Sequence, residues 1–195
     1  MYRFIYDKFL FLDFLPKKKQ ILTRFKDTDI LSLDTILKRA IMFLEIIPFE
    51  SRYSYIFRDL NVTWLDTYFY IEPKDFQLLE NCQESIINKG GHIFFAKNYE
   101  NIVGCFAFIP LKDKVYELGK MAVDPKYQGL KIGQKLLTFA INFAKKSHWS
   151  KIVLYSSTKL DTALHIYKKY GFKEVTLEKE LPYTRSDIKM ELELD

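Results

Sequence analysis

The stretch from Tyr116 to Gly133 constrains the fold of this chain more than any other part of the sequence. It predicts a strand, a sharp turn at Asp124-Pro125, a short loop that carries Gly129 and Gly133, and then a helix. The first backbone N–H groups of a helix have no partner within it and lie at the positive end of its dipole. A strand that leads through such a loop into a helix is therefore typical of a phosphate-binding site.

Composition and charge favour one globular domain without a nucleic-acid partner. The chain has 195 residues, of which 48% are hydrophobic and 28% are charged, which suits a protein that buries a core. Residues 1–41 hold nine Lys or Arg against five Asp or Glu, so they carry most of the net charge of +5. The other 154 residues hold 21 against 20 and are nearly neutral, so we expect no nucleic acid to bind.

The few cysteines and histidines predict neither a metal site nor a disulfide framework. Cys82 and Cys105 are the two cysteines, and they form no zinc-ligand spacing with the three scattered histidines. Free cysteines favour a reducing, cytoplasmic location. No apolar run reaches the roughly 20 residues of a membrane-spanning helix, so we expect no stable membrane insertion.

Residues 1–41 predict an N-terminal extension ahead of a compact domain that covers residues 42–195. The apolar run Phe9–Leu15 precedes Lys17–Lys19, and Asp29–Met42 has the apolar spacing of a helix. One interpretation is an arm that binds a partner or an anionic membrane surface. The others are an extension that packs on the domain, or a stretch upstream of a true start at Met42.

The rest of the chain predicts seven strands and four helices. The predicted strands are Phe43–Phe49, His92–Lys97, Ile102–Leu111, Val115–Val123, Lys151–Tyr155, Phe172–Leu177 and Asp187–Leu194. The predicted helices are Tyr53–Tyr70, Pro73–Ile87, Gly129–Lys146 and Leu160–Tyr170. The order strand, two helices, three strands, helix, strand, helix, two strands predicts an α/β (α+β) fold. Its mixed central sheet would have about seven strands, with helices on both faces.

The loop after the strand Val115–Val123 resembles that of a known family. It lacks the G-x-x-x-x-G-K-[ST] and G-x-G-x-x-G patterns of nucleotide-binding loops. Its sequence Gln128-Gly129-Leu130-Lys131-Ile132-Gly133 resembles [Gln/Arg]-x-x-Gly-x-[Gly/Ala], the cofactor signature of the GCN5-related N-acetyltransferase (GNAT) superfamily. Gln128 and Gly133 match the two ends, whereas Lys131 stands where the family usually has a glycine.

A second segment resembles the same family. Ala163–Phe172 contains the pattern Ala-x-x-x-Tyr-x-x-x-Gly-Phe. The resemblance implies a mostly antiparallel GNAT sheet and acetyl-coenzyme A (acetyl-CoA) as co-substrate, bound where Val115–Val123 and Lys151–Tyr155 splay apart. An asparagine of many members is Leu160 here, so we expect its cofactor contact to be absent or to be supplied by Ser157 or Thr158. The positions implied to bind the cofactor are Met121, Ala122, Val123, Gln128, Gly129, Leu130, Lys131, Ile132, Gly133 and Gln134.

Glu117 and Tyr167 are the predicted catalytic residues. The resemblance implies that Glu117 is the general base for the attacking amine and that Tyr167 protonates or hydrogen-bonds the departing thiolate. A carboxylate and a phenol suit these roles. The alternatives are a strand-face Glu117 paired with Lys120 or Lys114, and a Tyr167 that only fills the core.

Two further expectations concern the surroundings of these residues. Strict alternation along the strand would put Glu117, Gly119, Met121 and Val123 on one face. The loop before the last strand commonly closes over the acceptor in the family, so we predict that its Tyr183 and Arg185 bind substrate. An arginine there could bind a carboxylate bidentately.

The sequence therefore predicts an N-acetyltransferase that transfers an acetyl group from acetyl-CoA to a primary amine by direct attack in a ternary complex. Two alternatives stay open: a non-catalytic CoA-binding regulatory module, and an interaction or membrane-surface protein led by residues 1–41. The sequence names neither the acceptor amine nor the oligomeric state, and a homodimer is among the possibilities.

Overall fold

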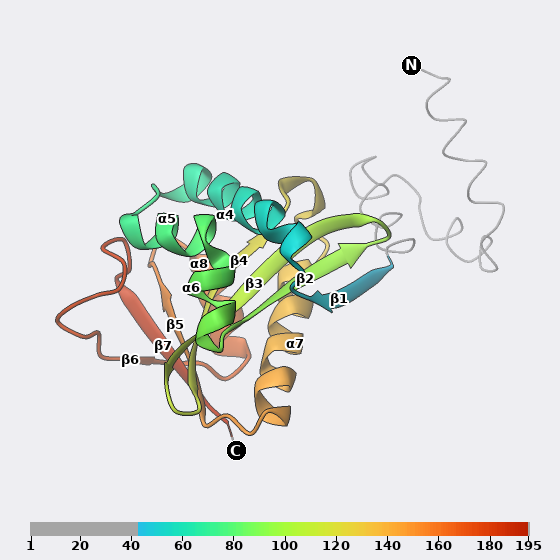
Figure 1. Cartoon of the computed structure of the whole chain (residues 1–195). Helices are drawn as coiled ribbons and strands as arrows, with labels where there is room; N and C mark the ends of the chain where they lie inside the picture. The colour runs from blue at the N-terminus through green and yellow to red at the C-terminus, as the bar shows by residue number, and fades with distance from the viewer. Residues whose placement is uncertain (1–42, 195) are drawn as a thin grey trace, which may run out of the picture. The chain divides into compact units, whose positions relative to one another are not determined.

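The computed structural model describes residues 43–194, coloured in Figure 1. The predicted N-terminal extension, its helix at residues 29–42 and the predicted start at Met42 lie outside these residues. The division of the chain at residue 42 therefore stays a prediction. Within the described part, no helix combines the length and the hydropathy that a membrane span needs.

One seven-stranded sheet organises the described residues, with the strand order β1-β2-β3-β4-β5-β7-β6. Only β4 and β5 are parallel, and the other five neighbouring pairs are antiparallel. This confirms the predicted mixed, mostly antiparallel sheet. The strands are β1 (Leu44–Pro48), β2 (His92–Asn98), β3 (Asn101–Lys112), β4 (Val115–Val123), β5 (Lys151–Ser156), β6 (Lys173–Val175) and β7 (Ile188–Glu193).

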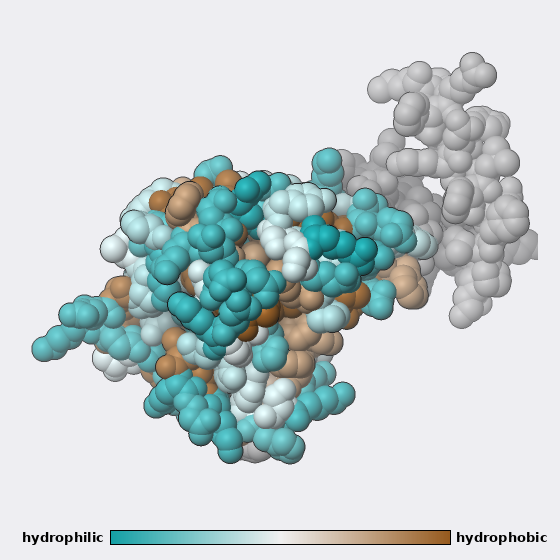
Figure 2. Space-filling view, viewed as in Figure 1, coloured by the Kyte–Doolittle hydropathy of each residue, from teal (hydrophilic) through white to brown (hydrophobic). Residues whose placement is uncertain are grey.

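Helices cover both faces of the sheet, as predicted (Figure 1). One face carries α4 (Ser54–Tyr68), α5 (Pro73–Glu80) and α6 (Cys82–Ser85), and the other carries α7 (Ile132–Lys146) and α8 (Asp161–Lys169). The buried side chains form two clusters, one under each layer, because each helix buries one apolar stripe against the sheet. The outer surface of the helices α4 to α6 is mainly hydrophilic (Figure 2).

Two helices differ from the sequence-based expectation. The helix predicted over Pro73–Ile87 is interrupted at Asn81, whose φ of −121° and ψ of 43° are not helical. A short 3₁₀ turn, Ile87–Lys89, then leads to Gly90 in the left-handed region. The next predicted helix begins at Ile132 rather than Gly129, because Lys131 is also left-handed, with a φ of 62°.

Strand β4 contains a bulge that breaks its alternation. Gly119 lies opposite Ala107 and Ala122 opposite Cys105, so three steps along β4 match two along β3. Lys120 lies in this bulge with a φ of 52°. Ala122 consequently packs under α4 to α6, whereas Met121 and Val123 pack on the α7 side. The expectation that Glu117, Gly119, Met121 and Val123 share one face is therefore wrong.

The two glycines that end the α6 region should respond differently to substitution. A Cβ on Gly91 would lie 2.5 Å from the carbonyl oxygen of Phe108 and 2.7 Å from Cγ2 of Ile86. We expect Gly91→Ala to lower the free energy of unfolding by about 3 kcal/mol, since the backbone of a central strand would have to move. Urea denaturation followed by circular dichroism measures this value.

Gly90→Ala is the matched control. Gly90 has a φ of +82°, but a Cβ there would meet no atom within 4 Å. It should cost only about 1 kcal/mol, through the left-handed conformation alone. Equal losses in the two variants would show that the packing at Gly91 is not as tight as described.

Candidate active site

A cavity of about 470 Å³ opens where β4 and β5 diverge. The two strands pair only from Val115 to Glu117 against Lys151 to Val153. Beyond that point, residues 117–121 of β4 face residues 154–157 of β5 and its loop across the cavity. Helices α4, α7 and α8 and the loop before β7 contribute the remaining walls. The space between the splayed strands is therefore hollow rather than filled by side chains.

Glu117 lies at the point of divergence with one unpaired oxygen. Its side chain is only 2% exposed, and its Oε1 accepts a hydrogen bond of 3.0 Å from the hydroxyl of Tyr183. Oε2 is buried and has no hydrogen-bond partner, and Nζ of Lys74 lies 3.9 Å away. A buried carboxylate oxygen without a partner is costly, so Oε2 is well suited to accept a proton from a ligand.

Tyr183 connects this carboxylate to Lys120. Nζ of Lys120 donates to the hydroxyl of Tyr183 at 3.0 Å and to Oδ1 of Asp75 at 2.8 Å. Burial, together with the charge of Glu117, raises the pKa of Tyr183 well above its ordinary value. Tyr183 therefore keeps its proton at neutral pH and donates it in the bond to Glu117.

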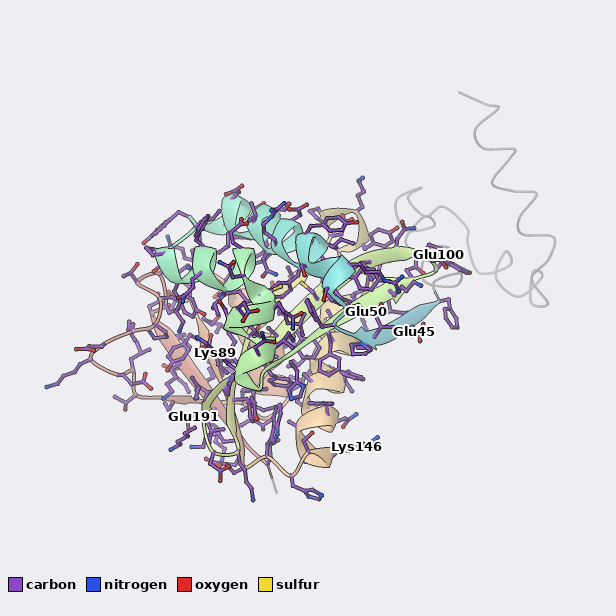
Figure 3. The ribbon with its side chains drawn as sticks, viewed as in Figure 1. Glu45, Glu50, Lys89, Glu100, Lys146 and Glu191 are labelled. Atoms are coloured by element: carbon purple, nitrogen blue, oxygen red, sulfur yellow. The ribbon has the colours of Figure 1, made fainter. Side chains whose placement is uncertain are left out.

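Arg185 completes a buried ionic cluster, which we define as Glu72, Asp75, Lys120 and Arg185. The Nη1 and Nη2 atoms of Arg185 donate to Asp75 at 2.5 and 2.9 Å, and Nη1 also donates to Glu72 at 2.9 Å. Asp75 is 0% exposed and Arg185 12% exposed. Other charged side chains, such as Glu45, Glu100 and Lys146 in Figure 3, lie at the periphery of the protein.

The cluster also fastens the loop before β7 to the start of α5. Glu72 and Asp75 form a capping box, in which the backbone N–H of Glu72 donates to Asp75 at 3.0 Å. The backbone N–H and the hydroxyl of Thr184 donate to Glu72 at 2.7 and 2.9 Å. Burial favours the protonated form of Asp75, but the hydrogen bond from Arg185 and the charge of Lys120 outweigh it and lower its pKa.

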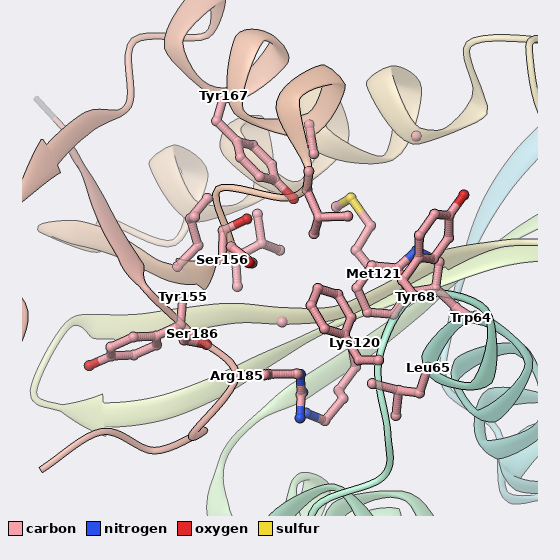
Figure 4. Close-up of a pocket in the computed structure, with 18 of the residues that line it drawn as sticks. Trp64, Leu65, Tyr68, Lys120, Met121, Tyr155, Ser156, Tyr167, Arg185 and Ser186 are labelled. Atoms are coloured by element: carbon pink, nitrogen blue, oxygen red, sulfur yellow. The ribbon is translucent and has the colours of Figure 1, made fainter.

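Tyr167 enters the cavity from α8 and points its hydroxyl into it (Figure 4). Burial raises the pKa of Tyr167 to about 12. The phenol is therefore protonated at neutral pH and available as a proton donor. Its ring also contacts Phe172 at 5.8 Å between centroids, so it both packs in the protein and faces the cavity.

The loop before α7 supplies another wall of the cavity. Gln128 and Gly133 line it, and the helix begins at Ile132. Lys131 is exposed and has a φ of 62°, a conformation that glycine adopts most readily. A left-handed conformation at this position explains why the family signature usually has a glycine there. Lys131 adopts that conformation here, with its side chain exposed to solvent.

A family model of known proteins matches the central part of the chain, which includes β4, α7, β5 and α8. Residues 89–174 match the model described as acetyltransferase (GNAT) domain. Over these residues the chain is therefore a GNAT domain, as its motifs predict. The fold agrees with this match. An acetyltransferase of the GNAT family from Staphylococcus aureus superposes with a TM-score of 0.70 and is 28% identical in sequence. The superposition covers 78% of this chain and 100% of that chain.

Curated N-acetyltransferases are similar to this chain over shorter segments. The probable N-acetyltransferase 14 of Xenopus tropicalis is 36% identical over 75 residues, which cover 38% of this chain and 36% of that protein. The N-acetyltransferase 8F1 of Rattus norvegicus is 27% identical over 101 residues, covering 49% and 46%. The match therefore spans less than half of each of these relatives.

A structural neighbour of the same fold has a coenzyme in its crystal structure. The PaiA N-acetyltransferase of Thermoplasma acidophilum, in complex with coenzyme A, has a TM-score of 0.62 and 20% identity. The match covers 78% of this chain and 99% of that chain.

The cavity brings together residues that the sequence analysis selected from distant segments. Glu117, Tyr167, Tyr183 and Arg185 all line it. Their roles remain predictions, and both side-chain nitrogens of Arg185 named above already bind carboxylates of the chain itself.

The predicted cofactor positions divide into three groups. Met121, Val123, Gln128 and Gly133 line the cavity. The side chains of Ala122, Leu130 and Ile132 are buried in the core, and Gly129, Lys131 and Gln134 lie outside the cavity lining.

The structure also narrows the replacement for the missing asparagine. Leu160 and Ser157 line the cavity. The backbone N–H and hydroxyl of Thr158 both donate to Asp187 at 2.6 Å. Ser157 is therefore the better placed of the two residues expected to contact the cofactor.

The sequence analysis missed the cluster residues Glu72 and Asp75 and the aromatic side of the cavity on α4. The Glu72-Pro73-Lys74-Asp75 sequence signals a helix start, which hides the second role of its carboxylates. The sequence suggests Lys120 only as a partner of Glu117, whereas its ammonium group donates to Asp75 and to the hydroxyl of Tyr183. Among residues 43–194, no group of three or more His, Cys, Asp or Glu side chains could hold a metal ion.

Arg185→Ala should destabilise the protein strongly at neutral pH. Its removal leaves Asp75 and Glu72 partly unpaired in a buried site, which costs about 3 kcal/mol. The pKa values of Asp75 and Glu72 are lowered in the folded protein, so their ionised forms stabilise it when the pH is above the pKa of these carboxyls in the unfolded chain. This stability is lost as the pH falls. The difference from wild type should therefore shrink below about pH 4, the usual range of free carboxyls. Urea unfolding across pH measures it.

Arg58→Ala provides the control for removal of an arginine. Arg58 makes ion pairs with Asp59 and Glu80 at the surface, where solvent screens them. We expect this variant to unfold at nearly the wild-type urea concentration. If Arg185→Ala behaved in the same way, the cluster would not hold the loop as described.

Proposed function

We propose that this chain is an acetyl-CoA-dependent N-acetyltransferase that acetylates a primary amine by direct attack in a ternary complex. The observation that carries the proposal is the buried Oε2 of Glu117, which accepts no hydrogen bond, in the same cavity as Tyr167 and the start of α7. A carboxylate oxygen that can accept a proton, a protonated phenol and free helix amides are the groups that acetyl transfer requires.

The residues around the cavity fit the co-substrate. The first backbone N–H groups of α7 suit its pyrophosphate, since they are unpaired within the helix and lie at its positive end. Gly133 leaves this end open, because a Cβ there would meet only Val123, at 4.0 Å. Acetyl-CoA would supply the acetyl group, activated as a thioester. The coenzyme A complex of the Thermoplasma acidophilum neighbour supports this assignment.

Glu117 acts as the general base. Most amines carry an extra proton at neutral pH and cannot attack in that state. Oε2 of Glu117 removes the proton, directly or through a water, while Tyr183 holds Oε1. Gly119 leaves room beside this base, since a Cβ at that position would lie 3.1 Å from Oε1.

Tyr167 acts as the general acid. Two protons leave the nitrogen of an ammonium acceptor. Glu117 passes the first to solvent before the attack and takes the second as the C–N bond forms and the C–S bond breaks, while Tyr167 protonates the leaving thiolate. The proton on Glu117 then returns to Tyr167 through water, so one proton is released in each turnover. No covalent acyl-enzyme is invoked. Burial raises the pKa of Cys105 to about 12, which keeps that thiol protonated and a poor nucleophile.

Glu117→Gln should abolish most of the turnover while coenzyme A still binds. The amide cannot take a proton, and loss of a general base costs about 10²- to 10⁴-fold in rate. Thiol release from acetyl-CoA with a panel of amines measures turnover. Thermal denaturation with and without coenzyme A measures binding, because a ligand of the native state raises the melting temperature.

Glu174→Gln is the control, since Glu174 is exposed on β6, away from the cavity lining. It should keep wild-type turnover. Wild-type protein that binds coenzyme A but releases no thiol with any amine would instead be the non-catalytic regulatory module. Absence of thermal stabilisation by coenzyme A would reject the proposed function altogether.

Tyr167→Phe should lower kcat and leave coenzyme A binding close to wild type. The ring would still fill its place against Phe172, but the proton donor would be gone. We expect a loss of about 10²-fold, at the lower end of general-acid effects. Steady-state kinetics with Tyr170→Phe as control tests this, since the hydroxyl of Tyr170 bonds Thr138 rather than facing the cavity. Equal kcat values in the two variants would remove Tyr167 from the mechanism.

A further inference from the structure

We propose that the acceptor is a primary amine with an aromatic or apolar body and without a carboxylate. The inference rests on the proposed function and names the substrate class of the same cavity. We call the part of the cavity around Glu117 and Tyr183 the acceptor side. Two of its features carry the inference: an aromatic wall, and an ionic cluster in which every charge already has a partner.

The aromatic wall consists of Trp64 and Tyr68 on α4 and Phe69 at its end. All three line the cavity, and the ring of Trp64 lies 5.4 Å from that of Tyr68 and 5.5 Å from that of Phe69. In Figure 4, Trp64 and Tyr68 lie across the cavity from Tyr155 and on the same side as Lys120. Tyr68 is 46% exposed, so the wall reaches from the cavity to the solvent. Such a surface binds flat or aliphatic groups well.

The charges beside this wall balance within the protein. Three carboxylates, of Glu72, Asp75 and Glu117, meet three cations, of Lys74, Lys120 and Arg185, in ion pairs. Among the described residues that line the cavity, the remaining lysine, Lys159, lies in the loop before α8, beside Leu160. The acceptor side therefore offers no cation that lacks an anionic partner.

An acceptor carboxylate would have to enter this side without a counter-ion or break the cluster to obtain one. Either course is unfavourable, since a buried charge needs a partner and breaking a buried pair is costly. A second ammonium group would also find no counter-ion without a partner beside this wall, because Glu72, Asp75 and Glu117 already pair with cations of the chain. The ring of Tyr183 likewise already has Lys74, Lys120 and Arg185 within 4.3 to 4.8 Å.

The test compares amines that differ in one group. 2-Phenylethylamine, L-phenylalaninamide and L-phenylalanine share an aromatic body, and only the last carries a carboxylate. Isothermal titration calorimetry measures their binding to the full chain, both alone and saturated with coenzyme A. We expect phenylethylamine and the amide to bind at least about tenfold more tightly than phenylalanine, and thiol release to give the same order of kcat/KM. Spermidine, as a polyamine, should bind more weakly than phenylethylamine.

The variant Trp64→Ala tests the wall, with Trp64→Phe as its conservative partner. Trp64→Ala should remove most of the preference for phenylethylamine over ethylamine, and Trp64→Phe should keep most of it. If calorimetry showed tighter binding of phenylethylamine and the amide than of phenylalanine and spermidine, but no amine released thiol, this inference would hold while the proposed function would fail. Equal or tighter binding of phenylalanine, preference for spermidine, or no binding of any aromatic amine would overturn the inference, whatever the activity.

Discussion

The divergence of β4 from β5 is the constraint on which the rest of the structure depends. The two strands pair over only three residues each, and they form the one parallel contact in the described sheet. A sheet that opens in its middle leaves backbone groups unpaired at the gap, which must find other partners. The cavity, the start of α7 and the side chain of Tyr167 all meet at this gap. The site is therefore a consequence of the sheet's geometry rather than an addition to its surface.

The bulge in β4 connects this geometry to the charges beside it. One extra residue at Lys120 turns its ammonium group toward Asp75, under α5, and turns Met121 toward the α7 side. The positive φ of Lys120 costs about 1 to 2 kcal/mol, and its burial lowers the pKa of the ammonium group. The ion pair with Asp75 and the hydrogen bond to Tyr183 offset this cost. Strain of this kind is characteristic of functional sites.

The sequence was sufficient wherever the information is local. Turn residues and apolar spacing place seven strands in the correct order, and β4 has the predicted bounds of Val115 and Val123. The motifs at Gln128–Gly133 and Ala163–Phe172 point to the family whose model the chain matches, and residues of both motifs line one cavity. The bulge in β4 was not predicted, because the sequence of residues 119–121 has no periodic pattern that indicates one. The contact of Asp75 with Arg185 escaped because it joins residues 110 positions apart, one of which looks like an ordinary helix cap.

The ionic cluster links the acceptor specificity proposed above to the position of Glu117, the proposed base. Arg185 fastens the loop before β7 to the start of α5, and the same loop delivers the hydroxyl of Tyr183 to Glu117. A substitution that freed Arg185 to bind an acceptor carboxylate would also release this loop and leave Oε1 of Glu117 without its donor. A relative with this cluster could therefore gain a carboxylate-binding cation only at another position.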